Sequence, residues 1–314
     1  MKVFEKIRKP ACLERGDTIG IVAPAWSFDP DKFKLGVDKL CRLGFRLKYS
    51  QSIFNKYWSM AGYDRKRAEL INSMFADKKV KAILCAKAGY GSIRTLPYLD
   101  TKTIKKNPKI FVGYSDITIL LSYIYKISKM VVFHGPVVSG EIQKGMNPMT
   151  LKYLLKAITQ TRPLGRMKFS TMRTIRRGNA RGILTGGNLS LLVNTIGTPY
   201  EINTENKILF LEDVGESFET IDNCLMHLKL AGKFRKIKGI IFGRMLGCAD
   251  RSGRRYNIKS MINDILHDVD VPIIYGFPSG HRMPGEVNVT LPLGVFTVID
   301  GTNAGLIIEE EGVS

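Results

Sequence analysis

Short apolar, β-branched runs alternate with segments of helical spacing along the first half of the chain. Thr18–Ala25 predicts a buried strand, and Asp29 followed by Pro30 predicts the N-cap and first turn of a helix that Gly44 ends. The same order repeats downstream, with strands predicted at 45–49, 82–86, 109–113 and 130–133 and helices at 64–75, from about 92, and at 117–127. Repeated strand–helix–strand units predict a parallel, doubly wound sheet.

The pattern changes after residue 160. Residues 161–180 are rich in Arg, Thr and Gly and lose the alternation, so we interpret them as a linker or crossover. The rest of the chain predicts a mixed α/β domain with more antiparallel pairing. Strands are expected at 182–184, 207–211, 239–242, 272–275, 288–291 and 296–299, and helices at 218–230 and 258–269. The segments 295–300 and 304–309 are expected to form a closing hairpin. The predicted organisation is an N-terminal domain (1–160), a basic linker (161–180) and a C-terminal domain (181–314).

Length and composition indicate a globular protein with a sizeable core. The 314 residues are 44% hydrophobic and 24% charged, which excludes a disordered, collagen-like or coiled-coil chain. No apolar run approaches the ~20 residues of a membrane helix, and the charged N-terminus lacks the apolar middle of a signal peptide. The five cysteines never form a CxxC pair and are interpreted as free thiols. We therefore expect a soluble, cytoplasmic protein.

Positive charge is concentrated in the first part of the chain. Of the net charge of +20, residues 1–160 contribute +17 and 161–180 contribute +6, whereas 181–314 contribute −3. Such asymmetry is typical of nucleic-acid-binding proteins, but here the basic residues are dispersed, and neither zinc-finger spacing nor an RNA-recognition motif accompanies them. We favour solvated helix faces, which would also attract an anionic substrate.

The histidines and glycine turns predict neither a metal nor a nucleotide cofactor. The four histidines, His134, His227, His267 and His281, lack partners at metal-ligand spacing. Gly89–Arg94 begins like a GxGxxG fingerprint but has arginine where the third glycine belongs. The turn is either a tight connection only or one that aims backbone amides into the crevice at the sheet edge.

Ser115 lies where a predicted strand ends and a helix begins. In that position a serine is lifted out of the sheet, the amide of Asp116 is aimed to stabilise an oxyanion, and the helix dipole favours negative charge. The alternative is that Ser115 and Asp116 are ordinary helix caps. The sequence Gly-Tyr-Ser-Asp also lacks the second glycine of a GxSxG elbow.

A nucleophilic serine needs a base and an acid that orients it. His281 lies in a Gly/Pro-rich loop directly after a predicted strand, where it is either a catalytic base or an exposed loop histidine. Glu212 and Asp213 end the apolar strand that starts at Lys207, and a carboxylate there is costly unless it is paired. Glu216 suits the first turn of the following helix.

Several segments, in order, resemble the serine LD-carboxypeptidase (muramoyltetrapeptide carboxypeptidase) family, which includes the microcin C immunity peptidases. The matching stretches run nearly end to end: GDTIGIVAPA at 16–25, AGYGSIRTLPYLD at 88–100, FVGYSDITILL at 111–121, FHGP at 133–136, TGGNLSLL at 185–192, GTPYE at 197–201, ILFLEDVGESFETID at 208–222, and GFPSGH with VTLPLG at 276–294. The resemblance implies a flavodoxin-like N-terminal domain that carries the nucleophile. It also implies a C-terminal domain that carries Glu and His, with the site between the domains.

Carried over by position, the resemblance makes Ser115 the nucleophile, His281 the base and Glu212 the orienting acid, with Asp213 and Glu216 as nearby alternatives. The implied oxyanion donors are the amide of Asp116 and one from the Ala88-Gly89 turn. The implied reaction is removal of the terminal D-alanine from murein tetrapeptides in cell-wall recycling, by a cytoplasmic homodimer without metal or cofactor.

Two departures and two rival functions remain open. Ala88 replaces a glycine of the family's usual turn and would be strained if its φ were positive. The stretch RMPGEVN after the histidine is longer than is usual in the family. The first rival is an immunity-type peptidase that cleaves peptide-nucleotide or acyl-adenylate conjugates. The second is a non-catalytic, basic nucleic-acid-binding protein.

Overall fold

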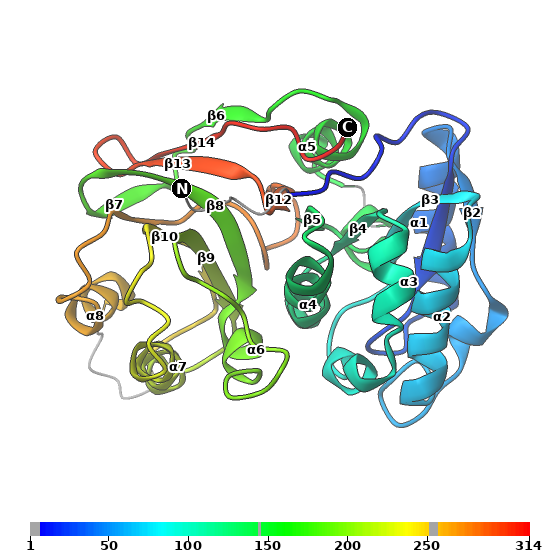
Figure 1. The fold of residues 1–314 in the computed structure, drawn as a ribbon, viewed down its shortest axis with the longest axis horizontal. Coiled ribbons are helices and arrows are strands. Elements are labelled where there is room, and N and C mark those ends of the chain that lie inside the picture. Colours follow the sequence, from blue (N-terminus) through cyan, green and yellow to red (C-terminus); the bar gives the residue numbers. More distant parts are fainter. Residues whose placement is uncertain (1–6, 144–145, 251–256) are drawn as a thin grey trace.

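The protein is built around two β-sheets that lie side by side (Figure 1). The structure is a computed structural model and describes residues 7–143, 146–250 and 257–314. It confirms the predicted α/β fold with a mostly parallel first sheet and a mixed second sheet that is richer in antiparallel pairs.

Six strands form the first sheet, in the order β12-β5-β4-β3-β1-β2. Neighbouring strands are parallel except for β12, which pairs antiparallel with β5. Without β12 this is the flavodoxin-like strand order, in which ligands bind beside the reversal of order between β1 and β3. The strands are β1 (Thr18–Val22), β2 (Arg46–Lys48), β3 (Val80–Cys85), β4 (Ile110–Gly113), β5 (Val132–His134) and β12 (Leu291–Leu293).

Helices between these strands cover the first sheet and follow the sequence pattern closely. α1 begins at Pro30, where the Asp29 carboxylate accepts hydrogen bonds from the next free amides, as predicted. The helix expected from Ser92 is instead a 3₁₀-helix with Pro97 inside it, because proline cannot continue an α-helix. The α-helices are α1 (Pro30–Arg42), α2 (Asp64–Ala76), α3 (Thr101–Lys106), α4 (Thr118–Ser128) and α5 (Pro148–Thr159).

Eight strands form the second sheet, in the order β6-β14-β13-β8-β9-β10-β11-β7. The four strands from β8 to β11 are parallel to one another, and the outer pairs are antiparallel. The strands are β6 (Gly165–Met167), β7 (Arg173–Arg176), β8 (Asn179–Asn188), β9 (Lys207–Val214), β10 (Gly239–Leu246), β11 (Ile273–Tyr275), β13 (Phe296–Asp300) and β14 (Gly305–Ile308). Helices α6 (Leu189–Val193), α7 (Phe218–Leu230) and α8 (Ile258–Ile265) follow β8, β9 and β10.

The segment 161–180 is more structured than a linker. It supplies β6 and β7, the two edge strands of the second sheet. The sequence concealed them because short edge strands bury little and their side chains stay polar. The division of the chain into domains at 160 and 180 stays a prediction.

One hydrophobic core joins the two sheets. It includes Phe133 of β5, Leu184 of β8, Phe210 of β9 and Leu291 of β12, all buried. A second core lies on the other face of the second sheet, beneath α6, α7 and α8. Because the first core is continuous between the sheets, residues at their junction are held in fixed relative positions.

Candidate active site

Ser115 lies directly after β4, at the first position of a 3₁₀-helix (Ser115–Ile117) that leads into α4. Its φ is +59°, a conformation that non-glycine residues seldom adopt and that is enriched at functional sites. This backbone conformation is compatible with the nucleophile-elbow interpretation, which stays a prediction. The amide of Asp116 is the second of this helix and has no acceptor within it.

The turn at 89–92 is tied to the Ser115 turn through Asp116. The amide of Ser92 donates to the Asp116 carboxylate at 2.8 Å, and the Ser92 hydroxyl donates to the Asp116 carbonyl at 2.5 Å. The carboxyl is buried, and burial raises its pKa. Gly89 and Gly91 take the positive φ values, +125° and +108°, whereas Ala88 does not. Alanine in the family's glycine position is therefore not strained.

Glu212 and His281 form a hydrogen-bonded pair. His281 Nδ1 donates to Glu212 Oε2 at 2.7 Å, and the His281 backbone amide donates to the same oxygen at 3.1 Å. Glu212 is fully buried on β9, and the His281 side chain is 16% exposed. Gly280, with a φ of +94°, lets the loop approach this closely, because a Cβ there would lie 2.4 Å from the same oxygen. The pairing leaves His281 Nε2 as the ring nitrogen free to accept a proton.

Burial and the charge of the partner shift the pKa values of Glu212 and His281 in opposite directions. Burial lowers the pKa of His281, but the Glu212 carboxylate outweighs it, so the pKa lies above its usual 6.5. Burial likewise raises the pKa of Glu212, and His281 reverses that shift, so the pKa lies below 4.5. The carboxylate therefore stays charged beside the imidazole at neutral pH.

Tyr114 links the serine turn to the histidine. Its ring contacts that of His281, with centroids 5.2 Å apart, and it directly precedes Ser115. Its hydroxyl donates to Glu141 Oε1 at 2.5 Å, and Glu141 Oε2 accepts from the Val137 amide. Glu141 is buried in a π-helix (Val138–Ile142), a rare element that is frequent at functional sites. Sequence reasoning missed both residues, because no motif signals a tyrosine–carboxylate contact.

The second sheet is also hydrogen-bonded to α4, the helix that follows the Ser115 turn. The amide of Asn188, at the end of β8, donates to Thr118 Oγ1 at the start of α4. The Asn188 side chain donates to Asp213, next to Glu212. Gly187 permits this contact, because a Cβ there would lie 2.5 Å from the Thr118 side chain. The TGGN segment thus connects the helix after Ser115 to the strand that carries Glu212.

The other carboxylates considered as acids have different partners. Asp213 accepts hydrogen bonds from the Asn188 side chain and from the amides of Ser190 and Val214. Glu216 precedes Ser217, the N-cap of α7, so the first-turn acid of that helix is Glu219 rather than Glu216. Of these three carboxylates, Glu212 is the one that is hydrogen-bonded to His281.

The remaining histidines do not belong to a group of side chains that could bind a metal ion in the described part of the chain. His134 is fully buried near Glu212 and contacts Ser279 Oγ, and burial lowers its pKa to about 4. Over the described ranges, no three His, Cys, Asp or Glu side chains gather closely enough to hold a metal ion. Nor is any helix in those ranges both long and apolar enough to span a membrane.

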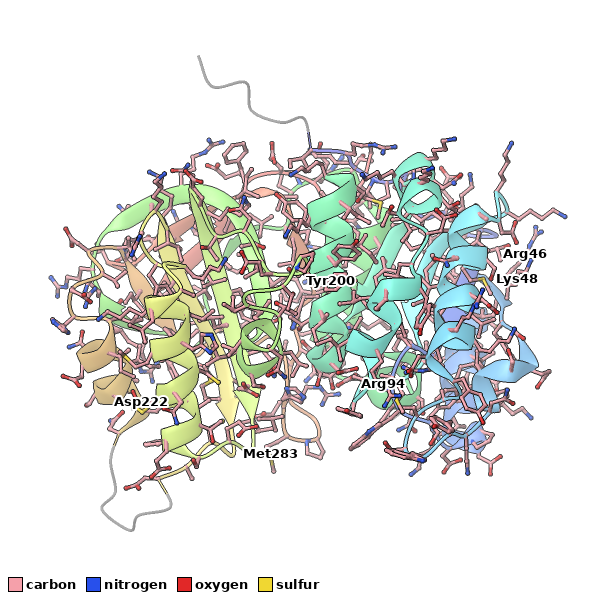
Figure 2. All side chains as sticks on the ribbon, turned by 60° about the horizontal axis from the view of Figure 1, so that its bottom comes forward. Arg46, Lys48, Arg94, Tyr200, Asp222 and Met283 are labelled. Carbon is pink, nitrogen blue, oxygen red and sulfur yellow. The ribbon has the colours of Figure 1, made fainter. Side chains whose placement is uncertain are left out.

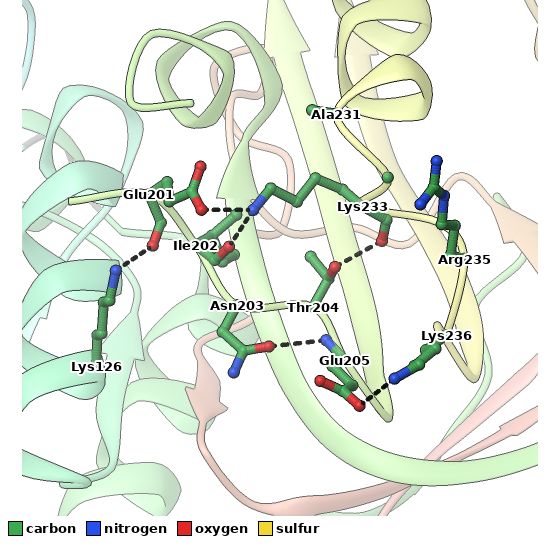
Figure 3. Close-up of a pocket in the computed structure, with 11 residues that line it drawn as sticks. Lys126, Glu201, Ile202, Asn203, Thr204, Glu205, Ala231, Lys233, Arg235 and Lys236 are labelled. Atoms are coloured by element: carbon green, nitrogen blue, oxygen red, sulfur yellow. Dashed lines mark hydrogen bonds and ion pairs between the residues drawn. The ribbon is translucent and has the colours of Figure 1, made fainter. Parts of the chain in front are cut away.

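A cavity of about 470 Å³ between α4 and the loops at 201–205 and 231–236 is not part of this site (Figure 3). Its lysines are already neutralised or bonded, since Lys233 pairs with Glu201 and Lys236 with Glu205. Lys126 donates to the Pro199 and Glu201 carbonyls. The lysines of this cavity are therefore engaged within the chain.

Comparison with known proteins places the chain in a family. Residues 19–135 match the LD-carboxypeptidase N-terminal domain, and residues 181–299 match the LD-carboxypeptidase C-terminal domain. The chain therefore belongs to the LD-carboxypeptidase family and is an enzyme, a peptidase.

The relatives with names include a murein peptide carboxypeptidase and a microcin self-immunity protein. The chain is 35% identical to a probable murein peptide carboxypeptidase of Bacillus subtilis, over 99% of this chain and 97% of the relative. It is 30% identical to the microcin C7 self-immunity protein MccF of Escherichia coli, over 97% and 96%. A structure of MccF in complex with glutamyl sulfamoyl guanosine superimposes with a TM-score of 0.89 at 26% identity, covering 98% of this chain and 99% of that one.

Proposed function

We propose that the protein is a serine LD-carboxypeptidase that removes the terminal D-alanine from murein tetrapeptides. The observation that carries this proposal is the bond from His281 Nδ1 to the buried Glu212, beside the turn that presents Ser115. Its sequence similarity to a probable murein peptide carboxypeptidase supports the choice of substrate.

In this proposal Ser115 is the nucleophile, His281 the base and Glu212 the acid that orients it. Ser115 Oγ attacks the carbonyl carbon before D-alanine, while His281 Nε2 takes the hydroxyl proton. When the C–N bond breaks, the imidazolium returns that proton to the leaving amine. An ester to Ser115 remains. Water then attacks the ester, again giving its proton to His281, and Ser115 leaves with a proton.

The negative oxygen of each tetrahedral intermediate would accept hydrogen bonds from the amides of Asp116 and Gly89. Support comes from the Ser92–Asp116 bonds, which hold the two turns together. The reaction needs no metal, so we expect a chelator to leave the rate unchanged. The cytoplasmic location, the role in cell-wall recycling and a homodimeric state are parts of the same proposal.

A second candidate is cleavage of peptide-nucleotide conjugates, which the similarity to MccF favours. Chromatography of the products separates the two. The enzyme is incubated with a tetrapeptide ending in D-alanine, with the same peptide ending in L-alanine, and with an aspartyl sulfamoyl adenosine-type conjugate. Release of alanine from the first peptide alone supports the carboxypeptidase. Cleavage of the conjugate alone supports the second candidate.

A further inference from the structure

Two arginines beside the Glu212–His281 pair each have a buried Nε atom with no hydrogen-bond partner. They are Arg244 on β10 and Arg282, which directly follows His281. Buried donors are almost always paired in folded proteins, and a buried cation is costly without a partner. Arg282 donates from its Nη1 to the neighbouring Met283 carbonyl. Arg244 instead forms an ion pair across the site.

Arg244 directly follows Gly243, which packs against the side chains of Phe210 and Glu212. A Cβ on Gly243 would lie 3.0 Å from Glu212 Cβ, so the two strands are in close contact here. The β9–β10 register is irregular between Phe242 and Met245. Side chains in this part of β10 therefore do not follow the regular alternation between the two faces of the sheet. The Arg244 side chain is 16% exposed, so its charge is largely withdrawn from water.

The partner of Arg244 is Glu286, five residues beyond His281. Arg244 Nη1 donates to Glu286 Oε2, which also accepts from the Met283 amide at 2.9 Å. The Glu286 side chain is 39% exposed, so a soluble carboxylate can compete for its position. Met283, on the same loop, is exposed and lies at the edge of the second sheet's lobe (Figure 2). This loop is the RMPGEVN stretch that is longer than is usual in the family.

We propose that Arg244 binds a carboxylate of the substrate and that Glu286 occupies this position in the free enzyme. The inference rests on the proposed function. The guanidinium presents a planar fork of donors that matches a carboxylate, and a substrate carboxylate would bind across Nη1, which holds Glu286, and its neighbour Nη2. The unpaired Nε leaves the buried guanidinium incompletely bonded while Glu286 is its partner. An entering substrate carboxylate replaces Glu286, which swings toward solvent with its loop.

Two of the free carboxylates of a murein tetrapeptide lie on the residues that flank the scissile bond. One is the free C-terminus of the D-alanine that leaves. The other is the side-chain carboxylate of diaminopimelate at the third position, which lysine lacks. Three substrates separate these sources: the tetrapeptide with diaminopimelate, the same peptide with a C-terminal amide, and the peptide with lysine at the third position.

The test compares kcat/KM of wild type and Arg244→Met on these substrates. On the diaminopimelate tetrapeptide we expect a loss of about 10- to 100-fold, the usual worth of a charge-assisted hydrogen bond. On the substrate that lacks the bound carboxylate, the two proteins should be nearly equal. Equality on the amide identifies the C-terminus, and equality on the lysine peptide identifies the third residue. A matched control is Arg166→Met, which removes an exposed arginine–aspartate pair elsewhere on the second sheet.

The variant Glu286→Gln tests whether Glu286 occupies the carboxylate position on Arg244 in the free enzyme. Because it removes the charged competitor while keeping the side chain's size, KM for the diaminopimelate tetrapeptide should fall about threefold or more with kcat unchanged. A higher KM, or an equal loss by Arg244→Met on all three substrates, would overturn the proposal and make the pair a structural bridge.

Binding separates this proposal from the proposed function. Calorimetry measures the affinity of Ser115→Ala for the uncleaved tetrapeptide, alone and combined with Arg244→Met. If wild type releases no D-alanine but binding still depends on Arg244, the proposed function fails and the carboxylate site stands. If D-alanine is released but binding is independent of Arg244, the carboxylate site fails and the proposed function stands.

Discussion

Replacing Glu212 with glutamine tests the role of the buried carboxylate. The substitution keeps size and shape but removes the charge that faces His281. Glu212 Oε2 lies 2.7 Å from His281 Nδ1. At an effective dielectric constant of about 20, an imidazolium and a carboxylate at this separation attract each other by about 6 kcal/mol. A neutral amide retains part of the hydrogen bonding.

The imidazolium forms only as the serine proton is transferred, so the lost attraction appears in the transition state. We expect a loss of about 4 to 6 kcal/mol, which corresponds to a decrease in kcat of roughly 10³- to 10⁴-fold. At a pH above the raised pKa of His281 the ring is neutral with or without this charge, so substrate binding should change little. KM should therefore stay within a few-fold of the wild-type value.

The assay is steady-state release of D-alanine from the tetrapeptide, with thermal unfolding as a check on folding. Asp213→Asn is the matched control, since Asp213 is the adjacent buried carboxylate but bonds to Asn188 and Ser190 instead of His281. It should lower the melting temperature and leave kcat within about tenfold of wild type. A folded Glu212→Gln protein with nearly normal kcat would refute the reasoning. An equal loss of kcat in the control would also refute it.

Three further predictions concern the surroundings of the pair. Because the pKa of His281 is raised above 6.5 and the neutral ring is the base, kcat/KM should fall as the pH drops through that raised value; a profile flat down to pH 5 would contradict this. Glu141→Gln removes a negative charge near the ring, so the acid limb should move to lower pH, whereas Tyr114→Phe should lower kcat about tenfold without such a shift. Gly89→Ala would place a Cβ 2.3 Å from the Trp26 ring at a φ of +125°, which displaces the turn. We therefore expect kcat to fall at least about tenfold, and unchanged kinetics would argue against an oxyanion role of the Gly89 amide.

Most of the first sheet could be predicted because local signals and tertiary packing agree there. The Asp29-Pro30 cap, the apolar spacing of α1 and the buried runs of β3 and β4 each specify one outcome. The helix expected from Ser92 shows the limit of this reasoning. A helix was expected to start near residue 92, but Pro97 lacks the amide that an α-helix needs there, and the segment is a 3₁₀-helix.

The second sheet was less predictable, since several of its strands are short and pair with distant segments. β12 is an example: its sequence belongs to the second half of the chain, yet it pairs with β5 of the first sheet. β6 and β7 carry too few buried residues to produce an alternating pattern. Such pairings depend on the whole fold and leave little local trace.

For the candidate site, the sequence pointed to residues with recognisable turn chemistry and gave no signal for residues that stand out only through their contacts. Ser115 and His281 follow strands in glycine-rich or capping contexts, and the resemblance to a family assigned them roles. Glu141 and Arg244 have no such local context. Their significance comes from a tyrosine hydroxyl and a buried, unpaired nitrogen, which only the folded chain reveals.

The most direct test of the central proposal is mass spectrometry of a murein tetrapeptide incubated with wild type and with Ser115→Ala. The account predicts loss of one D-alanine with wild type and no cleavage with the folded variant. Equal cleavage by both proteins would contradict the serine mechanism. An intact tetrapeptide after incubation with wild type would contradict the murein substrate.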